Sequence, residues 1–338
     1  MFVDSLAVGV IAWLVSFALT GVVQRQALRA RLLDIPNARS SHALPTPRGG
    51  GIAIAIVVCA GLAILAALGR VTSTTVLAIV PATLAVAIAG LVDDRRGLSA
   101  RIRLVIHFAA AALYIGTIGG PPALGIAWLD GLPWLPSAVT LLGLVWLLNL
   151  FNFMDGIDGI AGAELVFVSF ALALVTQLSS GPPASPLFAV LLGAAGAGFL
   201  GWNWPPAKIF MGDVGSGFVG LALGALSLQT MQECGIAMWV PLILLASFTT
   251  DATVTLLRRV VRGETWHAAH RTHAYQWLSR RWGSHRKVVL ALLASNLLWL
   301  LPLALLALRF PRHGGSIAAL AHLPLVVLAC WSGAGRRE

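Results

Sequence analysis

The sequence predicts an all-α fold, a single domain over residues 1–338 that forms a polytopic membrane bundle of about 10 or 11 transmembrane helices. Three observations lead to this prediction. The chain is 58% hydrophobic and only 11% charged, whereas soluble domains carry about 25% charged residues. Apolar stretches of about 17–22 residues, long enough to cross a hydrocarbon core, recur along the chain. Lysine and arginine concentrate in alternate loops between these stretches, as in membrane proteins.

The predicted spans follow one another with short connections. The first lacks the basic start and the small-residue cleavage site of a signal peptide, so we expect it to be retained. The eleven predicted spans are residues 4–22, 50–68, 74–92, 103–119, 136–151, 163–179, 185–202, 213–231, 237–257, 288–308 and 316–333.

The distribution of positive charge predicts the orientation. Of the 23 Lys and Arg residues, only Arg70, Arg309 and Arg312 lie on one side, which leaves 20 on the other. The positive-inside rule then places the N-terminus outside and the C-terminus in the cytoplasm. The net charge of +10 therefore marks cytoplasmic loops beside the lipid bilayer, and no nucleic-acid partner is expected.

Unusual polar residues gather in five predicted cytoplasmic loops, residues 30–51, 93–103, 152–162, 203–216 and 258–281. Five of the 13 acidic residues lie at the cytoplasmic ends of spans, namely Asp93, Asp94, Asp155, Asp158 and Asp213. Ionisable groups at membrane depth are costly and commonly mark functional sites. The topology was inferred from Lys and Arg alone. The finding that all five aspartates fall on the same face is therefore independent support for a site there.

Clustered aspartates favour a hard divalent cation. Mg²⁺ takes oxygen ligands and is usually held by one or two carboxylates together with substrate phosphates. The three cysteines form no CxxC motif, so neither a thiolate metal site nor a disulfide framework is indicated, and five aspartates without a cysteine cluster fit Mg²⁺ better than zinc. We therefore expect Mg²⁺, or Mn²⁺, beside a phosphorylated substrate.

Two glycine-containing motifs carry this expectation. In "NLFNFMDGIDGIAG" (149–162) polar residues recur every third position, at Asn149, Asn152, Asp155 and Asp158. Glycines weaken the helix here, so we expect the asparagines on the span and the aspartates at its frayed end. "MGDVGSG" (211–217) places Asp213 and Ser216 in a turn before a span, where backbone N–H groups at a helix N-terminus favour phosphate.

The last large loop supplies positive charge. In "HAAHRTHAY" (267–275), His270, Arg271 and His273 can donate to phosphate oxygens. Carboxylate-bound metal facing cationic donors suits phosphoryl transfer, which requires positioning and charge neutralisation.

Simpler interpretations stay open for single motifs. The acidic pair of residues 93–94 could belong to an ordinary charged loop, "PTPRGGG" could be a plain turn, and Asp155 and Asp158 could pair with arginine for structure. His107 is expected to pack inside its span, and His285 to be solvated. Asp251 is expected either to pack between helices or to support the site.

Taken together, "PTPRGGG", "DDRRGLSARIR", "NLFNFMDGIDGIAG", "AKIFMGDVGSGF" and "HRTHAYQ" resemble the polyprenyl-phosphate N-acetylhexosamine-1-phosphate transferases, the group containing WecA and MraY. The motifs occur in the family's order between residues 45 and 276. The last motif is nearer to O-antigen initiating enzymes of the WbpL type, which argues against a muramyl-pentapeptide substrate.

The resemblance implies ten or eleven helices in a bacterial inner membrane, with a groove on the cytoplasmic side. It implies a reaction in which a UDP-N-acetyl amino sugar and undecaprenyl phosphate give undecaprenyl-diphospho-sugar and UMP, the first step of O-antigen or other envelope polysaccharide synthesis. The sequence leaves open whether the sugar is N-acetylglucosamine, N-acetylfucosamine or N-acetylquinovosamine, and whether the chain forms a homodimer.

The resemblance also implies residue roles. Asp213, with help from Asp155, would hold Mg²⁺, and Asp93 or Asp94 would orient or deprotonate the lipid phosphate. The expected catalytic residues are Asp93, Asp94, Asp155 and Asp158. The expected substrate-binding residues are Arg48, Asn149, Asn152, Lys208, Ser216, His270, Arg271 and His273.

Two other functional classes fit the sequence less well. An intramembrane aspartyl protease needs two aspartates sharing a proton in an apolar setting. A transporter should show ionisable or helix-breaking positions at mid-membrane, often in paired repeats. Here the aspartates lie at span ends beside Arg and His, and no repeat is evident, so both classes are less favoured.

Overall fold

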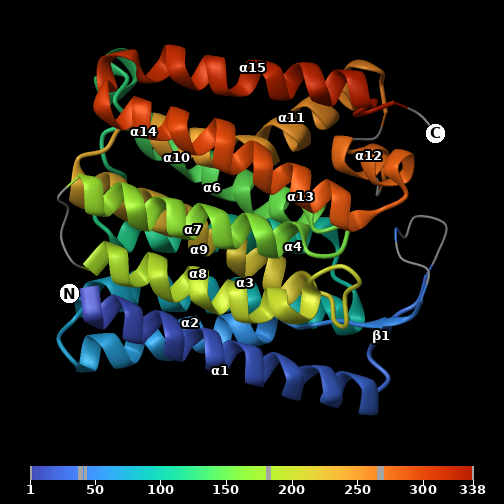
Figure 1. Cartoon of the computed structure of the whole chain (residues 1–338). Coiled ribbons are helices and arrows are strands. Elements are labelled where there is room, and N and C mark those ends of the chain that lie inside the picture. Colours follow the sequence, from blue (N-terminus) through green and yellow to red (C-terminus); the bar gives the residue numbers. More distant parts are fainter. Residues whose placement is uncertain (1, 37–40, 42–43, 180–183, 265–269, 337–338) are drawn as a thin grey trace.

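The computed structural model describes residues 2–36, 41, 44–179, 184–264 and 270–336. This part of the chain forms a bundle of long, roughly parallel helices (Figure 1). Its only strands are β1 (Leu33–Asp34) and β2 (Thr46–Pro47), which pair antiparallel at one end of the bundle. The predicted all-α bundle is therefore confirmed. The two termini lie at opposite ends (Figure 1), while their orientation relative to a membrane stays a prediction.

Nine of the described helical segments are long and apolar enough to cross a membrane. They are α1 (Phe2–Arg29), α3 (Ser73–Arg96), α4 (Ala100–Thr117), α6 (Leu135–Met154), α7 (Ile160–Leu178), α8 (Ala184–Asn203), α9 (Asp213–Cys234), the continuous α13 (His285–Ser295), η1 (Asn296–Leu300) and α14 (Leu301–Arg309), and α15 (Gly314–Ser332) with the preceding turn η2 (Pro311–His313). The apolar helix α2 (Gly51–Ala67) is shorter, at 17 residues. The remaining helices are α5 (Ala127–Asp130), α10 (Trp239–Leu244), α11 (Ala246–Val261) and α12 (Ala274–Trp282).

The predicted span 237–257 differs from the structure. It is divided at Leu245 into α10 and α11. The second piece is rich in Ser, Thr and Arg, and it packs against α6, α12 and α15. Its polar side chains thereby find protein partners that lipid does not supply.

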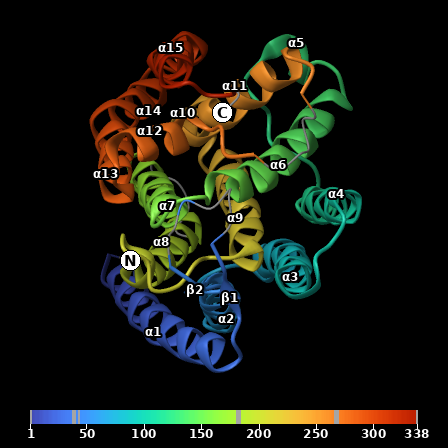
Figure 2. The same cartoon turned by 90° about the vertical axis from the view of Figure 1, so that its right-hand side faces the viewer.

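Helix α9 forms the centre of the bundle. It is buried continuously from Val214 to Met231 and contacts α2, α3, α6, α7 and α8, as the end-on view in Figure 2 shows. Small residues permit this close packing. A Cβ atom added to Gly51 would lie 2.2 Å from the Cα atom of Gly215, and one added to Gly220 would lie 2.9 Å from the Leu147 carbonyl oxygen. The central position of α9 sets its first residue, Asp213, among the ends of α3 and α6.

Candidate active site

A cavity of about 400 Å³ lies where α6 ends and α9 begins. Its walls come from segments far apart in the sequence. Eight residues predicted from the sequence line it: Arg48, Asp94, Asn152, Asp155, Asp158, Asp213, Ser216 and His270. We call this space the main cavity.

The end of α6 places the first two aspartates. The helix stops at Met154, and Asp155 takes a non-helical conformation with ψ of 45°. Gly159 has a φ of +78°, which glycine adopts without steric cost, so the chain can turn back into α7. The predicted arrangement, with Asn149 and Asn152 on the helix and the aspartates after it, is confirmed.

Tyr275 closes the end of α6. Its hydroxyl donates to the Phe153 carbonyl oxygen over 2.9 Å and thereby pairs one of the carbonyl groups that a helix end leaves free. A Cβ atom on Gly156 would lie 2.1 Å from that hydroxyl, so the glycine is required for the contact. This hydrogen bond joins α12 to the segment that carries Asp155.

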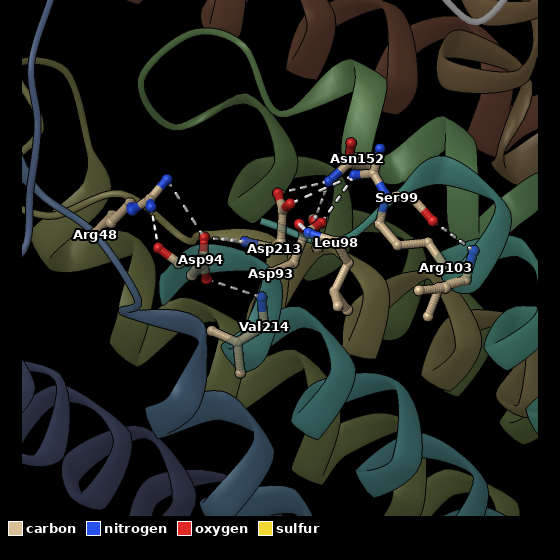
Figure 3. Close-up of polar contacts among 11 residues, drawn as sticks. Arg48, Asp93, Asp94, Leu98, Ser99, Arg103, Asn152, Asp213 and Val214 are labelled. Atoms are coloured by element: carbon tan, nitrogen blue, oxygen red, sulfur yellow. Dashed lines mark hydrogen bonds and ion pairs between the residues drawn. The ribbon is translucent and has the colours of Figure 1, made fainter. Parts of the chain in front are cut away.

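Asp213 is held in orientation but left open to the cavity. The Asn152 amide donates to Asp213 Oδ1 over 2.7 Å and to Ser216 Oγ over 3.2 Å. The Arg103 guanidinium lies 3.6 Å from Asp213 Oδ2 (Figure 3). The Asp213 side chain is 36% exposed, so it can bind a further ligand.

Asp94 binds the protein itself. Its carboxylate is 8% exposed and accepts hydrogen bonds from the backbone N–H groups of Asp213 and Val214, both over 3.2 Å (Figure 3). Arg48 lies 3.7 Å from the carboxylate and also donates to the Asp94 carbonyl oxygen.

The start of α9 therefore differs from the prediction. The N–H groups of Gly215 and Ser216 bond to the Gly212 carbonyl oxygen over 2.9 and 3.0 Å. With the two bonds to Asp94, all of the first four N–H groups of α9 have partners within the protein. The expectation that this terminus presents free N–H groups to a phosphate was wrong, because the Asp94 carboxylate occupies that position. Ser216 lies inside the helix and not in the turn before it.

Asp93 holds the turn between α3 and α4. Its carboxylate is 8% exposed and accepts from the Leu98 N–H over 2.5 Å and from Arg103 over 3.0 Å. It borders a smaller cavity of about 100 Å³ between α3, α4, α6 and α9, which Asn149 also lines. The Asn149 amide donates to the Val145 carbonyl oxygen over 2.7 Å.

The predicted basic donors are separated by the structure. Of the three in the last loop, only His270 lines the main cavity, whereas Arg271 lines a second cavity of about 580 Å³. His273 is 3% exposed, with Nδ1 lying 3.4 Å from Asp251 Oδ1. Lys208 lines neither cavity, and its ammonium group lies 5.5 Å from the centre of the Trp202 ring. His273 and Lys208 are therefore not among the residues that line the main cavity, and their predicted role in binding substrate stays a prediction.

The charge of His270 also differs from the expectation. Burial, followed by the electrostatic effects of His273 and Arg259, lowers the pKa of His270 to about 3. The imidazole is therefore neutral at pH 7, and in the substrate-free protein it offers a hydrogen bond and no positive charge.

Three further residues at the main cavity were missed. His285 Nδ1 lies 3.2 Å from Asp158 Oδ2, so the prediction of a solvated His285 was wrong. Asn203 accepts from the Gly159 N–H over 3.0 Å and donates to the Ile209 carbonyl oxygen over 2.9 Å, which joins two loops of the site. Gln276 accepts from the His273 N–H over 3.2 Å. Since 127 residues separate His285 from Asp158, no local motif signals their contact.

The carboxylates fit a cation that is shared with a substrate. Among the residues that the structure describes, no three His, Cys, Asp or Glu side chains group closely enough to hold a metal ion by themselves. Asp155 and Asp213 line the same cavity, and burial, followed by the charges of Asp213, Asp94 and Asp158, raises the pKa of Asp155 well above its usual range. A cation would relieve this repulsion, and Mg²⁺ needs only one or two carboxylates when phosphates complete its ligands.

Comparison with known proteins gives consistent matches. Residues 76–231 match the model of glycosyl transferase family 4. The chain is 30% identical over 292 residues to the probable undecaprenyl-phosphate N-acetylglucosaminyl 1-phosphate transferase of Bacillus subtilis, covering 84% of this chain and 80% of that protein. It is 30% identical over 322 residues to the decaprenyl-phosphate N-acetylglucosaminephosphotransferase of Mycolicibacterium smegmatis, covering 84% and 77%. It is 32% identical over 236 residues to the phospho-N-acetylmuramoyl-pentapeptide-transferase of Synechococcus, covering 64% of this chain and 61% of that protein.

Proposed function

Since this chain belongs to glycosyl transferase family 4, the polyprenyl-phosphate hexosamine-1-phosphate transferases, we propose that it transfers an N-acetyl-amino-sugar 1-phosphate from a UDP-sugar to undecaprenyl phosphate. The products are undecaprenyl-diphospho-sugar and UMP, and the reaction initiates O-antigen or another cell-envelope polysaccharide. The main cavity faces the cytoplasm of a bacterial inner membrane, where the soluble nucleotide meets the lipid.

One observation carries the proposal. Asp155 and Asp158, in the segment that follows α6, and Asp213, at the start of α9, line one cavity with Asn152 and Ser216. Asp34 of β1 also lines that cavity, and β1 lies at one end of the membrane-spanning bundle (Figure 1), where a bilayer lipid and a soluble nucleotide can meet.

The reaction is a displacement at phosphorus. An oxygen of the lipid phosphate attacks the sugar-bearing β-phosphorus of the UDP-sugar, and the bond from that phosphorus to the bridging oxygen breaks, releasing UMP. The lipid phosphate is already largely ionised near neutral pH, because the second pKa of a phosphate monoester is about 6. A residue that orients this phosphate therefore serves the reaction better than one that removes its proton.

Residues of this chain position the reactants. Asp213 and Asp155 would hold Mg²⁺, which would supply charge neutralisation on the diphosphate. Asn152 keeps the Asp213 carboxylate turned toward the cavity, and Asp158 borders the nucleotide. His270 donates a hydrogen bond to a phosphate oxygen.

The test is UMP release from purified protein with undecaprenyl phosphate, Mg²⁺ and a panel of UDP-N-acetyl sugars. We expect release with one sugar, its loss with EDTA, and its recovery with added Mg²⁺. Asp213→Asn is expected to lose turnover, with Asp4→Asn, in the first turn of α1 and outside the main cavity, as the matched control. EDTA-resistant release, or near-normal turnover by Asp213→Asn, would show that the metal assignment is incorrect.

A further inference from the structure

A connected set of polar side chains lies inside the bundle, between α7, η1 and α11. Glu164 on α7 is fully buried, and its Oε2 accepts from the Asn296 amide over 2.6 Å. Asn296, also fully buried, accepts at Oδ1 from the Ser247 hydroxyl of α11 over 2.6 Å. A carboxyl group is costly at such a position in a membrane helix and is by default a candidate for function.

The same face of α11 continues the connection toward the site. Ser247 and Asp251 are four residues apart, so they lie one above the other on the helix. Both line a cavity of about 130 Å³, together with Ala274 and Tyr275 of α12. Asp251 accepts from the backbone N–H groups of Ala274 over 2.8 Å and Tyr275 over 3.0 Å, and it thereby fixes the start of α12.

The start of α12 borders the main cavity. His273 stacks on His270, with ring centres 5.0 Å apart, and His270 and Gln276 both line that cavity. The position of α11 in the bundle therefore determines where these two side chains stand relative to the aspartates.

We propose that Glu164 is a positioning residue for the main cavity, acting through Asn296 and Ser247 on α11 and through Asp251 on the loop that carries His270. The effect of this arrangement on catalysis rests on the proposed transferase function. The structural coupling between Glu164 and the loop does not depend on that function.

The bonding of Glu164 argues against a role in stability alone. Its Oε1 is buried without a hydrogen-bond partner among the described residues, so the carboxyl is only half satisfied. Replacing both members of such a buried polar pair by apolar groups is often neutral or stabilising. The double variant Glu164→Leu/Asn296→Leu should therefore keep its melting temperature while losing the link to α11, which separates positioning from stability.

The experiment compares this double variant with Glu164→Leu, Glu164→Gln and Ser247→Ala. Thr176→Val is the matched control, because Thr176 is a buried polar residue of the same helix whose hydroxyl donates to the Leu172 carbonyl oxygen, within that helix. Hydrogen exchange measured by mass spectrometry reports on the Ala274 and Tyr275 amides, and UMP release reports kcat/KM for the UDP-sugar.

We expect faster exchange in residues 270–276, and a loss of kcat/KM of about fivefold to tenfold, in the variants that break the connection. Glu164→Gln keeps an acceptor for Asn296, so it and Thr176→Val should behave like the wild type. If Glu164→Leu fails to fold, the double variant and Ser247→Ala still test whether Glu164 positions the loop that carries His270.

Unchanged exchange in residues 270–276 of the folded double variant and of Ser247→Ala would overturn the proposal. So would faster exchange without a loss of kcat/KM in an active enzyme. A wild-type protein that releases no UMP would count against the transferase function, and the exchange data would then still decide the coupling by themselves.

Discussion

Replacing Asp94 by alanine tests whether this aspartate acts mainly on the protein or on the substrate. Its carboxylate is 8% exposed and receives the N–H groups of Asp213 and Val214, so we expect the variant to lose the anchor that fixes the start of α9. The carboxylate also lies 3.7 Å from Arg48, whose side chain is 39% exposed.

The expected magnitude follows from these contacts. Hydrogen bonds to a charged acceptor contribute about 1.5–3 kcal/mol each, and removing a helix-capping residue costs about 0.5–2 kcal/mol. The exposed pairing with Arg48 contributes less than about 1 kcal/mol. Because the two N–H groups can partly recover solvent, we expect Asp94→Ala to lower the free energy of unfolding by about 2–4 kcal/mol.

The assay is thermal unfolding in detergent, run beside UMP release on the same preparations. Asp4→Ala is the control, since its pairing with Arg70 over 3.3 Å is exposed and its loss should leave the melting temperature nearly unchanged. Asp94→Asn retains one acceptor oxygen and should fall between the wild type and Asp94→Ala in melting temperature. An unchanged melting temperature with activity abolished would refute the anchoring role and assign Asp94 to the substrate.

Three further outcomes are expected. Asn152→Asp places a carboxylate where an amide now donates to Asp213, so kcat/KM for UMP release should fall by at least about tenfold, and wild-type kinetics would contradict the orienting role. Gly90→Ala should lower stability by about 1–3 kcal/mol, because the added Cβ would lie 2.3 Å from the Asp213 carbonyl oxygen. Gly143→Ala, with no atom within 4 Å of its Cβ, is the control, and equal melting temperatures would refute the packing argument. The pKa of His270 is lowered to about 3 in the folded protein, so the stability linked to its neutral form is complete above the ordinary value of 6.5 and is lost as the pH falls toward about 3. Melting temperatures from pH 7.5 downward should therefore fall less steeply in His270→Gln, and parallel curves would contradict the shift.

These tests separate two kinds of aspartate at the end of the bundle. Asp213 and Asp155 face the main cavity, and Asp213 is 36% exposed. Asp93 and Asp94 are each 8% exposed and accept from backbone or arginine donors, although Asp94 also lines the main cavity. The acidic pair that resembles a family motif therefore has a structural task whatever contact it makes with a substrate.

The sequence by itself determined the helical bundle, most of its spans, and the span ends that meet at the site. These features depend on local properties of the sequence. The length of an apolar stretch predicts a span, and the glycine shortly after Met154 predicts the end of α6. Once the spans are known, the sequence also shows which aspartates lie at span ends. The grouping of Asp155, Asp158 and Asp213 at one cavity was accordingly within reach of sequence reasoning.

Only the tertiary structure decided which partner each polar group takes. Asp94 bonds to an N–H group 119 residues away, and Glu164 to an amide 132 residues away. Such contacts depend on how each helix is rotated and shifted against its neighbours. A local sequence pattern does not encode that geometry. For the same reason the sequence assigned His273 and Lys208 to the substrate, whereas packing directs one toward Asp251 and the other onto Trp202.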